Sequence, residues 1–347
     1  MTTGARGDPV FVRRVLIAVA IGAMALLLWR LVDVLLLGFG AVLVAILLRV
    51  VAEPIARRTP LSDGWALASA TVAVLAVIAI AVSLFGAEVR AQVAELIARL
   101  PQAWRSFEER LGIADLGQRL VDRAEDVAPA AGTVLSGVAG VVTSFVGGLA
   151  DFLLVVFGGL YLAAQPDVYR HGLLLLFPPG DGRKRLADTI DASGKALRRW
   201  LLGQLLAMMF VFVLTGLGLW AIGVPAALAL ALLAGLAEFV PIIGPVVSAI
   251  PALLIALAEG WQTALWTLFL YVAIQQVESN LITPLVQHRV VSLPPAATLF
   301  ALVAFGLLFG SLGVLFATPL AVVIFVGVKK LWVRETLGEP TELPGET

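Results

Sequence analysis

The sequence predicts an all-α membrane protein with about six full transmembrane helices and two further membrane hairpins broken at Gly and Pro. Hydrophobic residues make up 60% of the 347 positions, and several long apolar runs carry almost no charge. Such runs are typical of bilayer-spanning helices. Two of them, 224–258 and 290–328, contain Gly and Pro, which a continuous helix tolerates poorly. If each interrupted run instead crosses the membrane once, the count becomes eight spans.

Composition argues against most enzyme classes. The chain has no cysteine, so it has no disulfide, thiolate nucleophile or Cys-ligated metal. The two histidines, His171 and His288, are far apart and form no HExxH pattern, and no GxSxG or P-loop sequence is present. We therefore expect no enzyme activity, no metal and no cofactor. The alternative, a hydrolase that uses the membrane acids, needs a nucleophile beside a base at membrane depth. Net charge is zero, without a basic block, so we expect no nucleic-acid partner.

Residues 1–86 predict an N-terminal unit of three spans. The apolar runs Val15 to Trp29 and Val34 to Leu48 are separated by Arg30 and Asp33, and we expect them to form a tight helical hairpin. Three arginines then mark a cytoplasmic turn: Arg49, Arg57 and Arg58. An uncharged run from Trp65 to Gly86 is the third span.

Residues 87–137 predict an amphipathic helical segment outside the cytoplasm. Apolar side chains recur there every three or four positions: Val89, Val93, Leu96, Leu100, Trp104, Phe107 and Leu111. This stripe suits the membrane surface, a contact between subunits, or packing on the protein's own spans.

Charge bias predicts the orientation in a bacterial inner membrane. After a fourth span at 138–164, the loop 165–199 carries seven Lys/Arg against four Asp, whereas 87–126 carries six Arg against eight acids. The positive-inside rule then places 165–199 in the cytoplasm, together with both termini and the polar tail 334–347.

Residues 200–333 predict a membrane core of two weak repeats, 200–258 and 265–328. GPVVSAIP (244–251) and LGVLFATP (312–319) share a register, and each follows an apolar arm that opens on a proline. If each arm folds back at its break, the repeats are inverted and Arg289 lies inside; if each crosses once, Arg289 lies outside. We favour the hairpins, because paired Gly/Pro-interrupted segments mark transporter binding sites.

Candidate binding residues lie beside these breaks. Glu238 is the only charge between Trp200 and Ala258. Intramembrane acids are costly and usually face a cavity. The candidate solute- or ion-binding residues are Glu238, Gln275, Glu278 and Asn280, with Gln204 a weaker candidate. The residues expected to shape the cavity are Pro241, Gly244, Pro245, Pro251, Pro284, Gly310, Gly313 and Pro319. The polar side chains could alternatively join helices by hydrogen bonds.

Three motifs carry a family resemblance. FVPIIGP (239–245), QxxExNxxxP (275–284) and LFGSLGVLFATP (308–319) resemble the autoinducer-2 exporter family of bacterial membrane proteins. The resemblance implies a secondary transporter of a small polar solute, such as a quorum-sensing signal, or of a cation. We therefore predict an exporter-like transporter coupled to a proton or cation gradient, working in the bilayer as a homo-oligomer. A monovalent cation/proton antiporter and a passive pore or scaffold in a ring-like oligomer are the alternatives.

Overall fold

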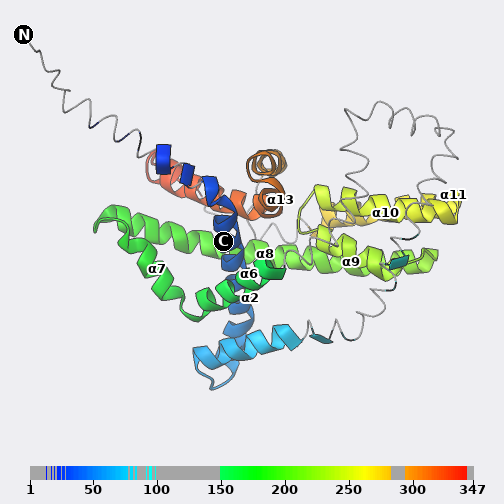
Figure 1. Cartoon of the computed structure of the whole chain (residues 1–347), viewed down its shortest axis with the longest axis horizontal. Helices are drawn as coiled ribbons and strands as arrows, with labels where there is room; N and C mark the ends of the chain where they lie inside the picture. Colours follow the sequence, from blue (N-terminus) through cyan, green and yellow to red (C-terminus); the bar gives the residue numbers. More distant parts are fainter. Residues whose placement is uncertain are drawn as a thin grey trace, which may run out of the picture.

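The computed structural model describes residues 29–76, 149–282 and 294–341 continuously, together with isolated positions between 13 and 98. These parts of the chain are helices joined by short turns, with no strand among them (Figure 1). Three described helices are long and apolar enough to cross a bilayer: Val32–Arg58, Asp181–Ile222 and Ala296–Arg334. These helices confirm the predicted all-α membrane fold, while the number of spans stays a prediction.

The first apolar runs do not form the expected hairpin. The Leu31 N–H donates to Leu27 O at 3.0 Å, and Leu35 N–H donates to Leu31 O at 2.9 Å, so helical hydrogen bonds continue past Asp33. From there α2 (Val32–Arg58) runs for 27 residues, with Pro54 near its end. The hairpin prediction was wrong because Arg30 to Asp33 holds no Gly, Pro or Asn, and two charges alone do not make a tight turn.

Close packing of α6 (Leu149–Ala164) on α2 depends on glycine. A Cβ at Gly159 would lie 2.6 Å from Val44 Cγ1 and 2.9 Å from Ala41 O, so only glycine lets the backbones come this close. Small residues bring transmembrane helices into contact in this way. After Gln165 the chain turns by 88° into α7 (Pro166–Leu175).

The predicted loop 165–199 is mostly helical. Its second half is the beginning of α8 (Asp181–Ile222), a single helix of 42 residues. A helix of that length spans about 63 Å, roughly twice the hydrocarbon core of a bilayer, so its polar first half projects out of the membrane. Arg170 on α7 holds this projecting half with a bidentate ion pair to Asp191, at 2.8 and 2.7 Å. The hydrogen bond to Asp191 raises the pKa of the Arg170 guanidinium.

The two interrupted runs fold back at their breaks. In the first, α9 (Ala227–Ala237) and α10 (Ile243–Glu259) flank a short turn, and a Cβ at Gly244 would lie 2.0 Å from Ala237 O. In the second, α13 (Pro295–Gly327) is broken at Gly310 (φ 64°, ψ −145°), and a Cβ at Gly313 would lie 2.0 Å from Phe305 O. Such approaches between residues seven or eight apart do not occur in a straight helix. The 39-residue run Ala296–Arg334 is therefore two arms rather than one rod.

Helix α11 (Trp261–Val277) follows α10 directly and ends in a π-helical turn, η1 (Glu278–Ile282). A second π-helical segment, η2 (Val328–Arg334), continues α13. Figure 1 shows α9, α10 and α11 extending together to one side of the molecule, next to the end of α8.

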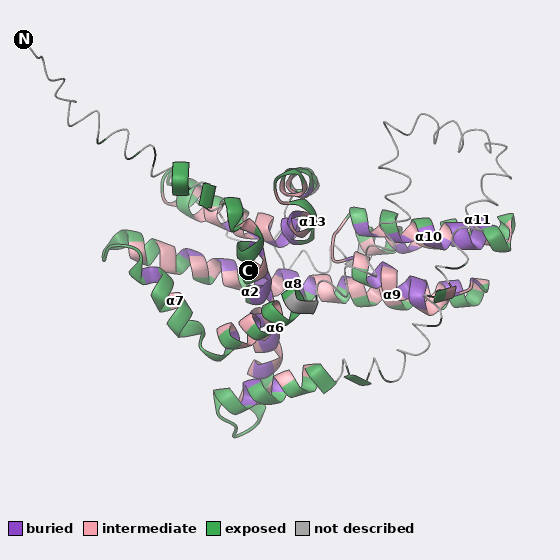
Figure 2. Cartoon of the chain, in the orientation of Figure 1, coloured by how far each residue is buried: buried purple, intermediate pink, exposed green. Residues whose placement is uncertain are grey.

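Buried side chains gather in two main places (Figure 2). One core forms where α2, α8 and the second arm of α13 meet: Leu36, Leu43, Ala196, Leu197, Trp200, Leu201, Phe316, Val322 and Val326. The other joins the end of α8 to α9, α10 and α11: Leu219, Val224, Ala226, Ala229, Leu230, Ala252, Ile255, Ala256, Leu257 and Ala264. Large apolar residues such as Trp220, Phe300 and Leu307 stay exposed, which suits a surface that faces lipid.

Candidate functional site

Glu238 occupies the end of α9, at the first break, and its side chain is only 2% exposed. Its backbone oxygen accepts a hydrogen bond from Gln204 Nε2 on α8 at 2.6 Å. Its carboxylate atom Oε2 is buried and has no hydrogen-bond partner among the described residues. A buried carboxylate oxygen without a partner is energetically expensive, so this atom is a candidate for binding a ligand or a proton.

The backbone beside Glu238 is strained. Ile242 has φ 73° and ψ −51°, the strained geometry at the centre of a γ-turn, and a β-branched residue rarely adopts a positive φ. Pro241 has no N–H to donate, and two short turns follow it: Ile243 N–H donates to Pro241 O and Gly244 N–H donates to Val240 O, both at 2.9 Å. Strain of this kind concentrates at functional sites, where the surrounding structure holds it in place.

The second acid, Glu278, begins the π-helical turn η1 after α11. Gln275 Nε2 donates to Glu278 Oε2 at 2.8 Å, as their spacing of three residues predicts. Asn280 does not join this pair, because its Nδ2 bonds the oxygens of Gln276 at 2.8 and 3.1 Å and its side chain is exposed. π-helical turns occur mostly as local bulges at functional sites.

These elements converge. The carboxyl groups of Glu238 and Glu278 lie close enough for their negative charges to repel each other. The Gln204 side chain, on α8, contacts the backbone of Glu238. Trp200 packs edge-on against Phe239, with ring centroids 5.7 Å apart, and covers the turn next to Glu238. Two acids and two amides drawn from α8, the α9–α10 turn, α11 and η1 can bind a proton, a small cation or a hydroxyl group.

The residues expected to shape a cavity fall into four groups. Pro241, Gly244 and Pro245 lie at the first break, and Gly310 and Gly313 lie at the second. Pro251 and Pro319 lie inside α10 and α13 and are buried by packing. Pro284 lies outside the described residues. That these residues enclose a cavity stays a prediction. Within the described residues, no group of three or more His, Cys, Asp or Glu side chains could hold a metal ion.

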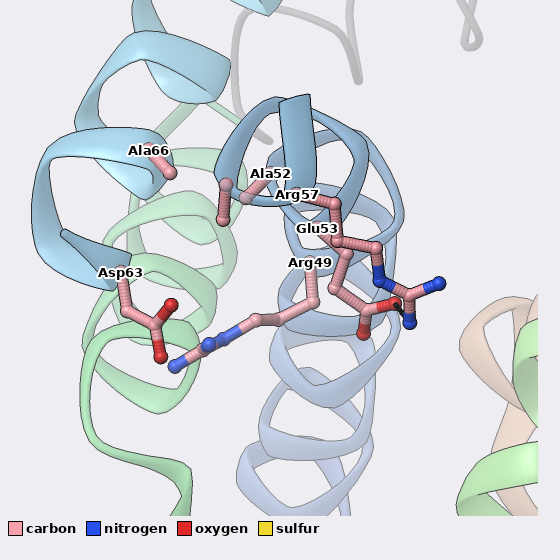
Figure 3. A pocket seen from close by; sticks show the side chains of 7 residues that line it. Arg49, Ala52, Glu53, Arg57, Asp63 and Ala66 are labelled. Atoms are coloured by element: carbon pink, nitrogen blue, oxygen red, sulfur yellow. Dashed lines mark ion pairs between the residues drawn. The ribbon is translucent and has the colours of Figure 1, made fainter. Parts of the chain in front are cut away.

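A second charged feature was missed at the sequence level. A pocket of about 160 Å³ lies between the end of α2 and the helix Asp63–Ala76, with Arg49, Glu53, Arg57 and Asp63 around it and alanines at its base (Figure 3). Figure 3 shows Arg49 and Asp63 pointing toward each other across it. Because Arg49 Nε donates to Ala163 O at 2.7 Å, the pocket also ties α2 to the end of α6.

An ion pair extends this feature to α8. Arg198 Nη1 donates to both oxygens of Glu53, at 2.8 and 2.7 Å. In the sequence, Arg49 and Arg57 served only as indicators of orientation. The pairing of Glu53 with Arg198 could not be predicted, because these residues are 145 positions apart. Arg57 and Arg198 both pair with Glu53, and Arg49 bonds a backbone carbonyl of α6, so we assign this cluster a structural role that joins α2, α6 and α8.

The chain is similar to known transport proteins. The profile of the family described as "AI-2E family transporter" matches residues 15–332. The chain is similar to "Putative transport protein YrrI" of Bacillus subtilis, with 29% identity over 56% of this chain and 55% of that protein. It is also similar to "Putative transport protein MT0215" of Mycobacterium tuberculosis, with 41% identity over 38% of this chain and 37% of that one. "Putative permease PerM" of Escherichia coli is 36% identical over 37% of each chain. The chain thus spans about half the length, or less, of these curated relatives.

Proposed function

Because the chain belongs to the AI-2E transporter family, we propose that it is a secondary transporter that moves a small polar solute through alternating access. We further propose that a proton or a small cation, carried by Glu238 and Glu278, drives this movement. The relatives described as transport proteins and a permease support a transport role over catalysis.

One observation carries the proposal: Glu238 is buried beside a strained break, with an unpartnered oxygen, and a second acid lies within electrostatic range. Two carboxylates in an apolar setting repel each other, and a proton or cation between them relieves that repulsion. Loading the site therefore removes charge from the membrane interior and lowers the barrier to rearrangement of the helices around it.

The amides support a hydroxylated solute. Gln204 and Gln275 both donate hydrogen bonds within the site, and their remaining donors and acceptors suit a hydroxylated molecule. A quorum-sensing signal is the candidate solute that the family suggests. In this proposal the protein works in the bacterial inner membrane as a homo-oligomer. The charge bias of its loops predicts that residues 165–199 and the C-terminal tail lie in the cytoplasm.

Reconstituted liposomes test the coupling. We expect counter-gradient solute movement when a proton or sodium gradient is imposed, and Glu278→Gln to fold and insert but lose driven transport and its dependence on pH. Asp151→Asn, which changes an exposed acid at the start of α6, is the matched control and is expected to behave as wild type. Full driven transport by the Gln variant, with a normal pH response, removes Glu278 from the mechanism.

The same assay separates the alternatives. A cation/proton antiporter exchanges ions across the vesicle membrane without any organic solute, and the paired acids suit that exchange equally well. A passive pore moves solute only down its own gradient, whatever ion gradient is imposed. A purely structural Glu278 predicts that Gln is tolerated and Glu278→Leu misfolds, because Gln275 then loses its partner.

A further inference from the structure

A second polar level lies three helical turns away from the acidic site. Thr215 on α8 comes eleven residues after Gln204, and Thr267 on α11 comes eleven residues before Glu278. Eleven residues are close to three turns, so each threonine lies on the same helix face as its polar counterpart, about 16 Å along the axis.

The register between α8 and α11 brings the two threonines to the same height. Val211 packs with Ile274 in one cluster, Leu219 packs in a cluster with Ala264, and the side chain of Leu270 fills the space over Gly218. These contacts make the helices antiparallel. Gln204 then lies at the height of Glu278 along the interface, and Thr215 lies at the height of Thr267.

Both threonine hydroxyls lack partners in the described structure. Thr215 is 1% exposed and Thr267 is 0% exposed, and neither Oγ1 has a hydrogen-bond partner among the described residues. Helical threonines commonly donate to the carbonyl one turn back, as buried Thr189 does to Arg185 O at 2.7 Å. Two buried hydroxyls that forgo that bond at one level are oxygens available to a ligand. One turn beyond Thr267, the Tyr271 hydroxyl lies 3.4 Å from Ser248 O and adds polar atoms on the α10 side.

An apolar layer separates the two polar levels. Val211, Ala234 and Ile274 form one buried cluster between them, contributed by α8, α9 and α11. The helices are close here, because a Cβ at Gly235 would lie 2.7 Å from Phe212 Cβ and one at Gly216 would lie 3.3 Å from Ala231 Cβ. A ligand therefore passes between the levels only when these helices move.

We propose that Thr215 and Thr267 form a second oxygen-lined site for the small monovalent cation that Glu238 and Glu278 bind, with the apolar layer as the barrier between them. This inference rests on the proposed coupling function. Hydroxyl oxygens are neutral, hard ligands that suit such cations. Without a counter-charge they hold the cation less strongly than the carboxylates do, and sites along a conduction path must release what they bind.

Isosteric substitution tests the site. The variant Thr215→Val/Thr267→Val removes both hydroxyls and keeps the shape, Thr215→Ser/Thr267→Ser keeps the hydroxyls, and Thr189→Val is the matched control on α8. We measure the rise in Tm on adding Na⁺, Li⁺ or K⁺ in detergent, and driven flux in liposomes. We expect the Val pair to fold and to need at least about tenfold more cation for both effects, which corresponds to about 1.4 kcal/mol. The Ser pair and the control are expected to respond as wild type.

Two different results separate failure of this site from failure of the proposed function. If the Val pair shows the wild-type cation dependence of Tm and flux, and only a higher Tm from loss of two unsatisfied hydroxyls, the second site is refuted while coupling stands. If wild-type liposomes show no driven flux, the coupling function is refuted. In that case the site is still supported if the Val pair loses the cation dependence of Tm that the wild type shows. If the Val pair keeps that dependence, the site is overturned.

Discussion

The two breaks depend on single glycines, and alanine at either position is expected to disrupt the fold measurably. A methyl group at Gly244 would meet Ala237 O at 2.0 Å, and one at Gly313 would meet Phe305 O at 2.0 Å, where ordinary contact begins at 3.4 Å. The obstacle in both cases is backbone rather than a movable side chain, so the arms must separate by more than an ångström. Overpacking of this size costs about 1–3 kcal/mol.

Gly327→Ala provides the matched control. This glycine also lies in α13, but nothing lies within 4 Å of its would-be Cβ, and alanine there gains about 0.8–1.0 kcal/mol in helix propensity. The tight and open glycines should therefore differ by about 2–4 kcal/mol. Thermal unfolding in one detergent measures the order of Tm values. The Tm values of Gly244→Ala and Gly313→Ala should be lower than that of the wild type, whereas the Tm of Gly327→Ala should not. Equal Tm values for all three variants would refute the hairpin geometry.

Three further predictions concern topology, assembly and the projecting end of α8. Cysteine at Arg289, which lies outside the described residues, should be labelled only from the cytoplasmic side, and labelling from outside would favour eight spans. Replacing Val93, Leu100 and Phe107 with serine should weaken the oligomer in detergent, and an unchanged mass would assign this stripe, also largely outside the described residues, to lipid or to the protein's own spans. Asp191→Asn should lower stability by only about 0.2–1 kcal/mol, because the ion pair with Arg170 is 38–47% exposed, and added salt should reduce the difference. A larger, salt-independent loss of Tm would mean that Asp191 does more than pair with Arg170.

Local sequence signals predicted the features that depend on local chemistry. The uncharged runs indicated helices in a bilayer, and the Gly/Pro clusters indicated where those helices break. Glu238 was found because one acid in a long apolar stretch is conspicuous, and the Gln275–Glu278 bond follows from a spacing of three residues on a helix. None of these predictions needed knowledge of which helices are neighbours.

Features that depend on distant parts of the chain were not predicted. The Gln204 hydrogen bond to the Glu238 backbone joins residues 34 apart, and the sequence supplied only the two residue types. Asn280 was grouped with Glu278, but its Nδ2 bonds Gln276, four residues earlier on the same helix face. That one helix continues through residue 199 was also not predicted, since polarity changes along α8 without ending the helix.

The two repeats are alike in backbone and different in chemistry. Each break places a residue with positive φ, Ile242 or Gly310, shortly before a glycine that lies against the carbonyl of the preceding arm. Only the first break carries an acid, and the second, FGSLG at 309–313, has no charge. After that second break, α13 packs through Phe316 and Val322 against α2 and α8, the framework of the molecule. If the two repeats are inverted, as we predict, and exchange conformations during transport, they exchange backbone geometry but not charge. The proposed mechanism accordingly keeps the acidic site between the first break and η1 in both states, and the helices that carry Val211, Ala234 and Ile274 move the barrier beside it.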